Sequence, residues 1–156
     1  MSVGTDDLRI GSITELMEPQ ALIEEMPPSA AAVATVSKAR QAIHSILCGD
    51  DDRLVTVVGP CSIHDTDAAL EYAGFLQETA NALADDLCVV MRVYFEKPRT
   101  TVGWKGLIND PDLNNTFQIN KGLKRARGLL AQLAEQGLAA GTEYLDLISP
   151  QYLADL

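Results

Sequence analysis

The sequence predicts an α/β fold with a parallel sheet. Two short apolar runs, at residues 54–58 and 87–93, are typical of strands, and a segment with helical periodicity follows each. The predicted order is strand, helix, strand, helix, strand, helix, which requires parallel strands joined by right-handed crossovers. The 156-residue chain is 47% hydrophobic, which is enough apolar material for a globular core.

Residues 1–52 are predicted to form an acidic, mainly helical extension ahead of the strands. A short amphipathic helix over 19–25 is bounded by prolines at both ends. A longer helix follows over 30–48, because Ser29 is a favoured N-cap residue and apolar residues recur along one face of this segment. Gly49 and the acidic residues after it end this helix.

Three βα units are predicted after residue 53. The run 54–58 is nearly all apolar, as in a strand buried on both faces of a parallel sheet. A long loop follows the second strand, and a weaker third strand is predicted at 139–146. The helices of these units are expected at 67–84, at 117–136 with Gly137 just past its end, and from Ser149 and Pro150 onward, as N-cap and first helical residue.

The last predicted helix has only begun at Leu156. Its apolar residues Tyr152, Leu153 and Leu156 still need something to pack against, so we expect the chain to be cut short. A (β/α)₈ barrel needs about 250 residues. We therefore expect an N-terminal extension and the first three βα units of such a barrel.

Composition argues against several classes of protein. The formal charge is −10, which disfavours nucleic acid as a partner because non-specific affinity for it needs a broad basic surface. No apolar run approaches the length of a membrane span, and the N-terminal residues lack a secretory signal pattern. Three cysteines form a sparse, odd set, which favours a reducing compartment. We expect a cytoplasmic protein.

Positive charge is concentrated in one region of this acidic chain. Residues 86–127 hold eight of the twelve Lys and Arg residues and only four acidic residues. Four of the cations fall within fourteen residues after the second strand, at Arg92, Lys97, Arg99 and Lys105. Such a loop favours a small anionic ligand, usually a phosphorylated one. Arg92 is the most telling, because it ends an apolar run and guanidinium groups bind phosphate or carboxylate in a bidentate manner.

Several of these residues allow more than one role. Lys97 could pair with a phosphate, protonate a leaving group, form a Schiff base, or be a solvated loop lysine. Cys61 and His64 have a spacing compatible with metal binding, but spacing alone favours a plain loop with Asp65 as a helix N-cap. Glu143 could orient a cation or face solvent. The remaining cations lie at helical spacing and are expected to form a solvated face: Lys121, Lys124, Arg125 and Arg127.

Long contiguous strings resemble one enzyme family. The segments Gly59–Asp65 and Arg92–Gly106 are similar to signature loops of the microbial feedback-regulated class I 3-deoxy-D-arabino-heptulosonate-7-phosphate (DAHP) synthases, and the resemblance extends from about Asp6 to Leu156. It implies a (β/α)₈ TIM barrel, with 1–52 as a regulatory and dimerisation extension and 53–156 as the first part of the catalytic domain. It also implies a transferase that condenses phosphoenolpyruvate with erythrose 4-phosphate and releases phosphate, the first step of the shikimate pathway of aromatic amino acid biosynthesis.

The resemblance also implies roles for individual residues. Cys61 would be a ligand of a divalent metal ion of the Mn, Fe, Co or Zn type, and His64 would not. Phosphoenolpyruvate would lie against Arg92 and Lys97, with Lys97 near the reacting carbons and Glu143 near this pocket. Erythrose 4-phosphate would be lined by Pro98, Arg99 and Thr100. A metal ion can polarise the aldehyde of that sugar.

Regulation and assembly are implied as well. Four residues match positions of a site for an inhibitory aromatic amino acid, for which we favour phenylalanine over tyrosine: Asp6, Asp7, Pro150 and Gln151. The full-length enzyme is expected to be a homo-oligomer, a dimer or a tetramer.

The chain departs from this family in what it lacks. The other metal ligands of the family, a His, a Glu and an Asp, come from later strands, and one cysteine cannot replace the roughly three protein ligands of a catalytic metal site. We therefore expect the 156 residues alone to be inactive. One alternative is a non-catalytic fragment that associates with a full-length subunit, and another is an aldolase that forms a Schiff base through Lys97.

Overall fold

A computed structural model describes residues 10–98 and 102–156 of the chain. Three parallel strands form one small sheet in the order β1-β2-β3. In its register Val58 lies opposite Met91, and Arg92 opposite Gly141, so that the three strands end at the same edge. The strands are β1 (Leu54–Val58), β2 (Leu87–Arg92) and β3 (Ala140–Gly141).

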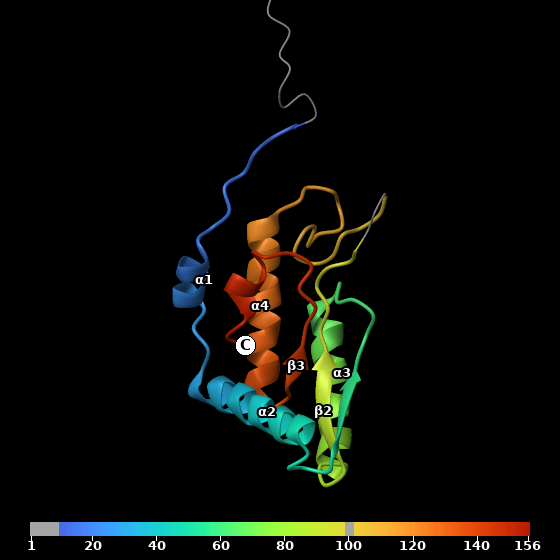
Figure 1. Ribbon diagram of the computed structural model, residues 1–156. Coiled ribbons are helices and arrows are strands. Elements are labelled where there is room, and N and C mark those ends of the chain that lie inside the picture. Colours follow the sequence, from blue (N-terminus) through green and yellow to red (C-terminus); the bar gives the residue numbers. More distant parts are fainter. Residues whose placement is uncertain (1–9, 99–101) are drawn as a thin grey trace, which may run out of the picture.

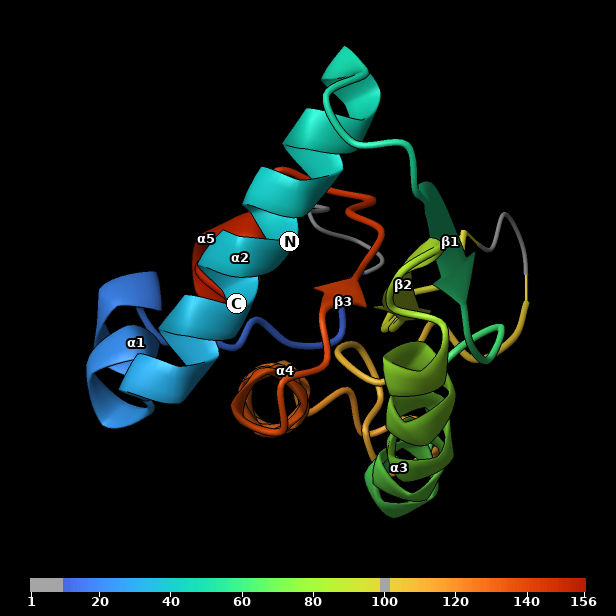
Figure 2. The ribbon, with the colours of Figure 1, turned by 90° about the horizontal axis from the view of Figure 1, so that it is seen from below.

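Helices follow each strand and also precede the sheet. Figure 2 shows α3 and α4 on one side of the strands, and Figure 1 shows α2 beside the amino-terminal part of the sheet. The loops that follow the strands gather at the opposite, carboxyl end. The helices are α1 (Pro19–Glu25), α2 (Ala30–Cys48), α3 (Thr66–Ala82), α4 (Ile119–Glu135) and α5 (Pro150–Leu153).

Local capping explains where α2 and α3 start. The Ser29 side chain accepts a hydrogen bond from the N–H of Ala32 at 3.1 Å. The Asp65 carboxylate accepts from the N–H groups of Asp67 and Ala68 at 2.9 and 3.1 Å. Each cap satisfies backbone donors that the first helical turn leaves free. The predicted helices at 19–25 and 30–48 are confirmed at both ends, and those at 67–84 and 117–136 within about two residues.

The core lies where α4 packs between the sheet and the N-terminal helices. Leu129 and Leu133 of α4 and Met91 of β2 are buried together with Leu22 of α1. Gly122 permits a close approach in this core, since a Cβ at that position would lie 2.1 Å from the carbonyl oxygen of Ile108. No helix in the described part of the chain is long and apolar enough to cross a membrane.

The sheet differs from the prediction at both of its edges. Strand β1 was expected to be buried on both faces, but Leu54 and Val57 are 67% and 55% exposed. Strand β3 covers two residues instead of 139–146, because its pairing with β2 ends at Gly141 and the chain then bends into a turn at 146–149. In that turn the Asp146 carboxylate accepts hydrogen bonds from the N–H groups of Ile148 and Ser149 at 2.5 and 2.7 Å.

The start of α5 also differs in detail. Pro150 is the first helical residue, as predicted, but Ser149 makes no N-cap hydrogen bond. Its hydroxyl donates to Asp146 instead. The expectation that the apolar residues of this segment lack packing partners is wrong, because they are buried in the chain's own core, and the Tyr152 hydroxyl donates to the carbonyl of Met17 at 2.5 Å.

The prediction of a solvated cationic face on α4 is wrong for one residue. Arg127 is completely buried. Its guanidinium forms a bidentate ion pair with Asp155 at 2.7 and 2.8 Å, and it also donates to the carbonyls of Met26 and Tyr152 at 2.9 and 2.8 Å. The other three cations lie at the surface in ion pairs, Lys121 and Arg125 with Asp112 and Lys124 with Glu25.

Candidate functional site

A cavity of about 350 Å³ lies at the carboxyl edge of the sheet. It collects residues from the loops after all three strands. This is the edge at which parallel α/β proteins hold their ligands. Its lining consists of Cys61 and Ser62 after β1, Arg92 at the end of β2, Tyr94, Glu96, Lys97 and Pro98 in the next loop, and Glu143 after β3. The predicted residues Cys61, Arg92, Lys97, Pro98 and Glu143 are therefore brought together.

Lys97 is held in place by a loop that folds back on itself. Its backbone N–H donates to the carbonyl of Lys105 at 2.9 Å, and Glu96 pairs with Gly106 in an antiparallel bridge. Gly106 has φ +119°, and a Cβ there would lie 2.1 Å from the carbonyl oxygen of Phe95. Only glycine fits this crossing. The Lys97 ammonium nitrogen lies 4.0 Å from the Cys61 sulfur, at the mouth of the cavity.

Arg92 carries a charge that no carboxylate neutralises among the described residues. Its guanidinium donates to the carbonyl of Cys61 at 3.3 Å and lies over the ring of Tyr94, 4.0 Å from the centroid. Its Nε is buried and has no hydrogen-bond partner within the described structure. Lys97 is likewise outside the ion pairs found in the described part of the chain. Both cations are thus available to an anionic ligand.

Glu96 joins the cationic loop to the turn after β3. It accepts a hydrogen bond from the Asn109 side chain at 3.3 Å, and its other carboxylate oxygen lies 3.5 Å from the Ser149 hydroxyl oxygen. Burial raises the pKa of Glu96, the nearby charge of Asp146 raises it further, and hydrogen bonds from Asn109 and from the Leu145 backbone offset part of the shift. For Asp146, burial pushes the pKa upward, but hydrogen bonds from Ser149 and Ile148 outweigh it and lower the pKa overall.

We expect Glu96→Gln to stabilise the fold in a pH-dependent manner. Because the folded-state pKa of Glu96 lies above its unfolded value, the contribution of Glu96 to stability is full below the unfolded pKa and is lost as pH rises through the folded pKa. The neutral amide does not undergo this loss. Urea unfolding should therefore show the variant and the parent equal near pH 3 and the variant more stable at pH 7; a difference that stays constant with pH would contradict this.

Four of the predicted site residues lie outside the described residues, namely Asp6, Asp7, Arg99 and Thr100. Pro150 and Gln151 lie at the start of α5, where the Gln151 side chain donates to the carbonyl of Leu147 at 3.2 Å. They are not part of the lining of the cavity at the carboxyl edge of the sheet. His64 faces the edge of Trp104, with ring centroids 6.5 Å apart. Tyr94 and Glu96 also line the cavity, although no sequence pattern singles them out. Glu96 contacts Ser149, 53 residues along the chain, whereas Tyr94 stacks on Arg92, two residues before it.

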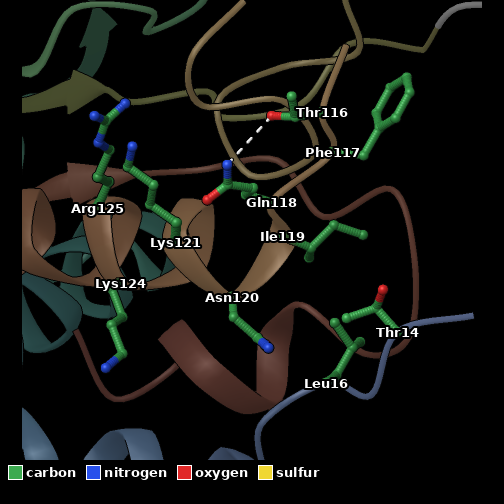
Figure 3. A pocket seen from close by; sticks show the side chains of 10 residues that line it. All are labelled: Thr14, Leu16, Thr116, Phe117, Gln118, Ile119, Asn120, Lys121, Lys124 and Arg125. Carbon is green, nitrogen blue, oxygen red and sulfur yellow. Dashed lines mark hydrogen bonds between the residues drawn. The ribbon is translucent and has the colours of Figure 1, made fainter. Parts of the chain in front are cut away.

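A larger cavity, of about 680 Å³, lies between the start of α4 and residues 14–16 (Figure 3). Its cations are Lys121, Lys124 and Arg125. Each of them already pairs with a carboxylate, either Asp112 or Glu25, at 2.6 to 3.1 Å. This cavity is therefore less suited to a small anion than the one around Arg92 and Lys97.

Comparisons with known proteins show similarity along the whole chain. The Phe-sensitive phospho-2-dehydro-3-deoxyheptonate aldolase of Escherichia coli strain K12 is 60% identical over 156 residues, which cover 100% of this chain and 45% of that protein. The enzyme of the same general name from Amycolatopsis methanolica is 53% identical over 99% of this chain and 76% of its own length. A solved structure of the aldolase from Francisella tularensis SCHU S4 matches with a TM-score of 0.89 and 51% identity, over 94% of this chain and 43% of that one.

The chain spans less than half the length of the Escherichia coli relative and of the Francisella structure. The similarity nevertheless runs through the whole described sheet and all of the cavity. Residues 27–156 match the family model described as the DAHP synthetase I family, which is well over half of the chain. The chain therefore belongs to the DAHP synthetase I family.

Proposed function

We propose that this chain is part of a 3-deoxy-7-phosphoheptulonate synthase, which condenses phosphoenolpyruvate with erythrose 4-phosphate and releases phosphate. The observation that carries the proposal is the meeting of four residues in one cavity at the carboxyl ends of three strands: Cys61 after β1, Arg92 at the end of β2, Lys97 in the next loop and Glu143 after β3. The names of the relatives, which are phospho-2-dehydro-3-deoxyheptonate aldolases, support the same reaction. The sheet and its helices would be the first βα units of a (β/α)₈ barrel.

In this proposal the residues divide between the two substrates. Arg92 and Lys97 bind the charged groups of phosphoenolpyruvate, because both cations are free of carboxylate partners in the described structure. Lys97 lies near the reacting carbons, and Glu143 borders the same pocket. Pro98, Arg99 and Thr100 bind erythrose 4-phosphate. Residues 1–52 form the regulatory and dimerisation extension, and 53–156 belong to the catalytic domain.

A divalent metal ion would use Cys61 as one of its ligands. The Cys61 sulfur is exposed at the cavity and faces an ammonium group rather than other donors. The described residues contain no group of three or more His, Cys, Asp or Glu side chains that could hold a metal. These residues by themselves therefore do not fit a metal centre, and we expect the 156-residue chain alone not to catalyse the condensation.

A second candidate function is a non-catalytic fragment that associates with a full-length subunit. It is favoured by the open edge of the sheet, where Leu54 and Val57 of β1 are exposed and the strand offers unpaired backbone groups. Co-purification of the chain with an intact subunit, without uptake of metal by the chain, would support this candidate.

Regulation by an aromatic amino acid follows from the same relationship. Relatives are named Phe-sensitive, Trp-sensitive or phenylalanine-inhibited. We propose that phenylalanine is the inhibitor and that Asp6, Asp7, Pro150 and Gln151 contact it in a full-length homo-oligomer. We also propose a cytoplasmic location, which the sparse, odd set of three cysteines supports.

The proposed function is tested by titrating the purified chain with phosphoenolpyruvate and following the amide signals by NMR. We expect saturable shifts around Arg92 and Lys97 with a dissociation constant of about 1 mM, because only part of the site is present. Pyruvate, which lacks the phosphate, should bind more weakly. Equal binding of the two compounds, or shifts centred on α4 near Lys121, would contradict the proposal, and condensation by the isolated chain would contradict its predicted inactivity.

A further inference from the structure

Tyr94 and Arg92 form a stacked pair that lines the cavity at the carboxyl edge of the sheet. They lie two residues apart where β2 runs into the loop, and alternate residues of an extended chain face the same side. The guanidinium carbon lies 4.0 Å from the centre of the Tyr94 ring, which is close for a cation–π contact. Both residues line the cavity.

Hydrogen bonds alone do not fix the orientation of Arg92. Its bond to the carbonyl of Cys61 is long, at 3.3 Å, and its Nε has no partner among the described residues. A single long bond leaves the guanidinium free to rotate about that contact. The ring of Tyr94 supplies a second restraint. The guanidinium is then held at one edge by the Cys61 carbonyl and on one face by the ring, which defines its orientation.

Comparison with Arg127 shows that stacking leaves the charge of Arg92 without a neutralising partner. The edge of the Arg127 guanidinium is filled by Asp155 and by two carbonyls, and its charge is neutralised. Arg92 is held by its face instead. The Tyr94 ring covers only the face of the guanidinium, so the N–H edge and the positive charge remain available to an anionic ligand. A carboxylate would occupy the N–H edge and neutralise the charge.

We propose that Tyr94 is a positioning residue, whose ring holds the Arg92 guanidinium so that its N–H edge is presented to the phosphate or carboxylate of the ligand. This inference deepens the proposed function and rests on it for the identity of the ligand. The orientation of Arg92 before any ligand binds does not depend on that identity.

The first test compares Tyr94→Leu, which keeps apolar volume without an aromatic face, with Tyr94→Phe, which keeps the face. ¹⁵N relaxation of the Arg92 Nε–Hε group is measured in the 156-residue chain without ligand. We expect this group to be ordered in the parent and in Tyr94→Phe and mobile in Tyr94→Leu. Equal order in all three proteins would overturn the inference.

The second test measures affinity for phosphoenolpyruvate in the same proteins. Tyr94→Leu should weaken binding by about threefold to thirtyfold, the range of one cation–π contact, and Tyr94→Phe should restore most of it. In an Arg92→Ala background, Tyr94→Leu should have no further effect. An equal loss in that background would show a general structural role and overturn the inference. If the parent chain does not bind phosphoenolpyruvate, the proposed function fails, and the relaxation measurement still decides the role of Tyr94.

Discussion

Arg127→Met should lower the free energy of unfolding by about 3–5 kcal/mol, the largest loss we expect from any single side chain discussed above. The methionine fills much of the space but donates no hydrogen bond. Asp155 then loses its bidentate partner, and the carbonyls of Met26 and Tyr152 lose a donor inside the core. Urea unfolding followed by circular dichroism measures the loss.

Lys124→Met is the matched control on the same helix. It also removes one positive charge from α4 and breaks an ion pair, but Lys124 and Glu25 are 44% and 50% exposed. Pairs of this kind contribute about 0–1 kcal/mol. Similar unfolding midpoints for the two variants would show that the Arg127 network does not hold α1, α4 and α5 together.

The ion pair between Arg127 and Asp155 also makes the stability of the fold depend on pH. The hydrogen bond from Arg127 lowers the pKa of Asp155, while burial opposes this shift. A carboxyl whose folded-state pKa is depressed contributes stability above its unfolded pKa, and that stability is lost as pH falls through the folded pKa. The destabilisation caused by Arg127→Met should therefore shrink as pH falls below about 4.

The burial of Arg127 depends on one contact that the sequence pattern predicts and one that it does not. The helix itself was predictable, and so were its neighbours, because capping residues such as Ser29 and Asp65 act within a few positions of themselves. Helical spacing places Arg127 four residues after Leu123 and three before Leu130, on the apolar face of α4 and apart from the exposed cations. Its partner Asp155 lies 28 residues further along the chain, and no local pattern connects the two.

The residues of the candidate site were predictable where they lie at the end of a strand, but their contacts with distant residues were not. Arg92 ends β2 and Lys97 follows it, so a cationic site at the carboxyl edge of the sheet was predictable from the residues. Spacing alone favoured a plain loop for Cys61, and only the family resemblance made it a site residue. The contact of Glu96 with Ser149 spans 53 residues and depends on where the third strand ends. The strand was predicted to continue to residue 146, but it ends at Gly141. Tyr94 was missed for another reason, since stacking depends on how the loop leaves the strand.

Lys97→Met should weaken phosphoenolpyruvate binding by about tenfold to a hundredfold, which corresponds to the loss of one charge-assisted hydrogen bond or ion pair to the ligand. The control is Lys121→Met. Both substitutions remove one positive charge from an acidic chain, so their effects on long-range attraction are similar. They differ in position, because Lys97 borders the cavity at the edge of the sheet and lies 4.0 Å from Cys61, whereas Lys121 is paired with Asp112 beside the other cavity.

Titration of the two variants at low and moderate salt separates a built site from diffuse attraction. Contact between Lys97 and the ligand predicts that the difference between the variants persists when salt screens the surface charges. Equal losses in both variants, both vanishing with salt, would mean that phosphoenolpyruvate is attracted to the basic region as a whole. A loss confined to Lys97→Met would place the ligand between the loops that follow β1 and β2, where Arg92 presents its free edge.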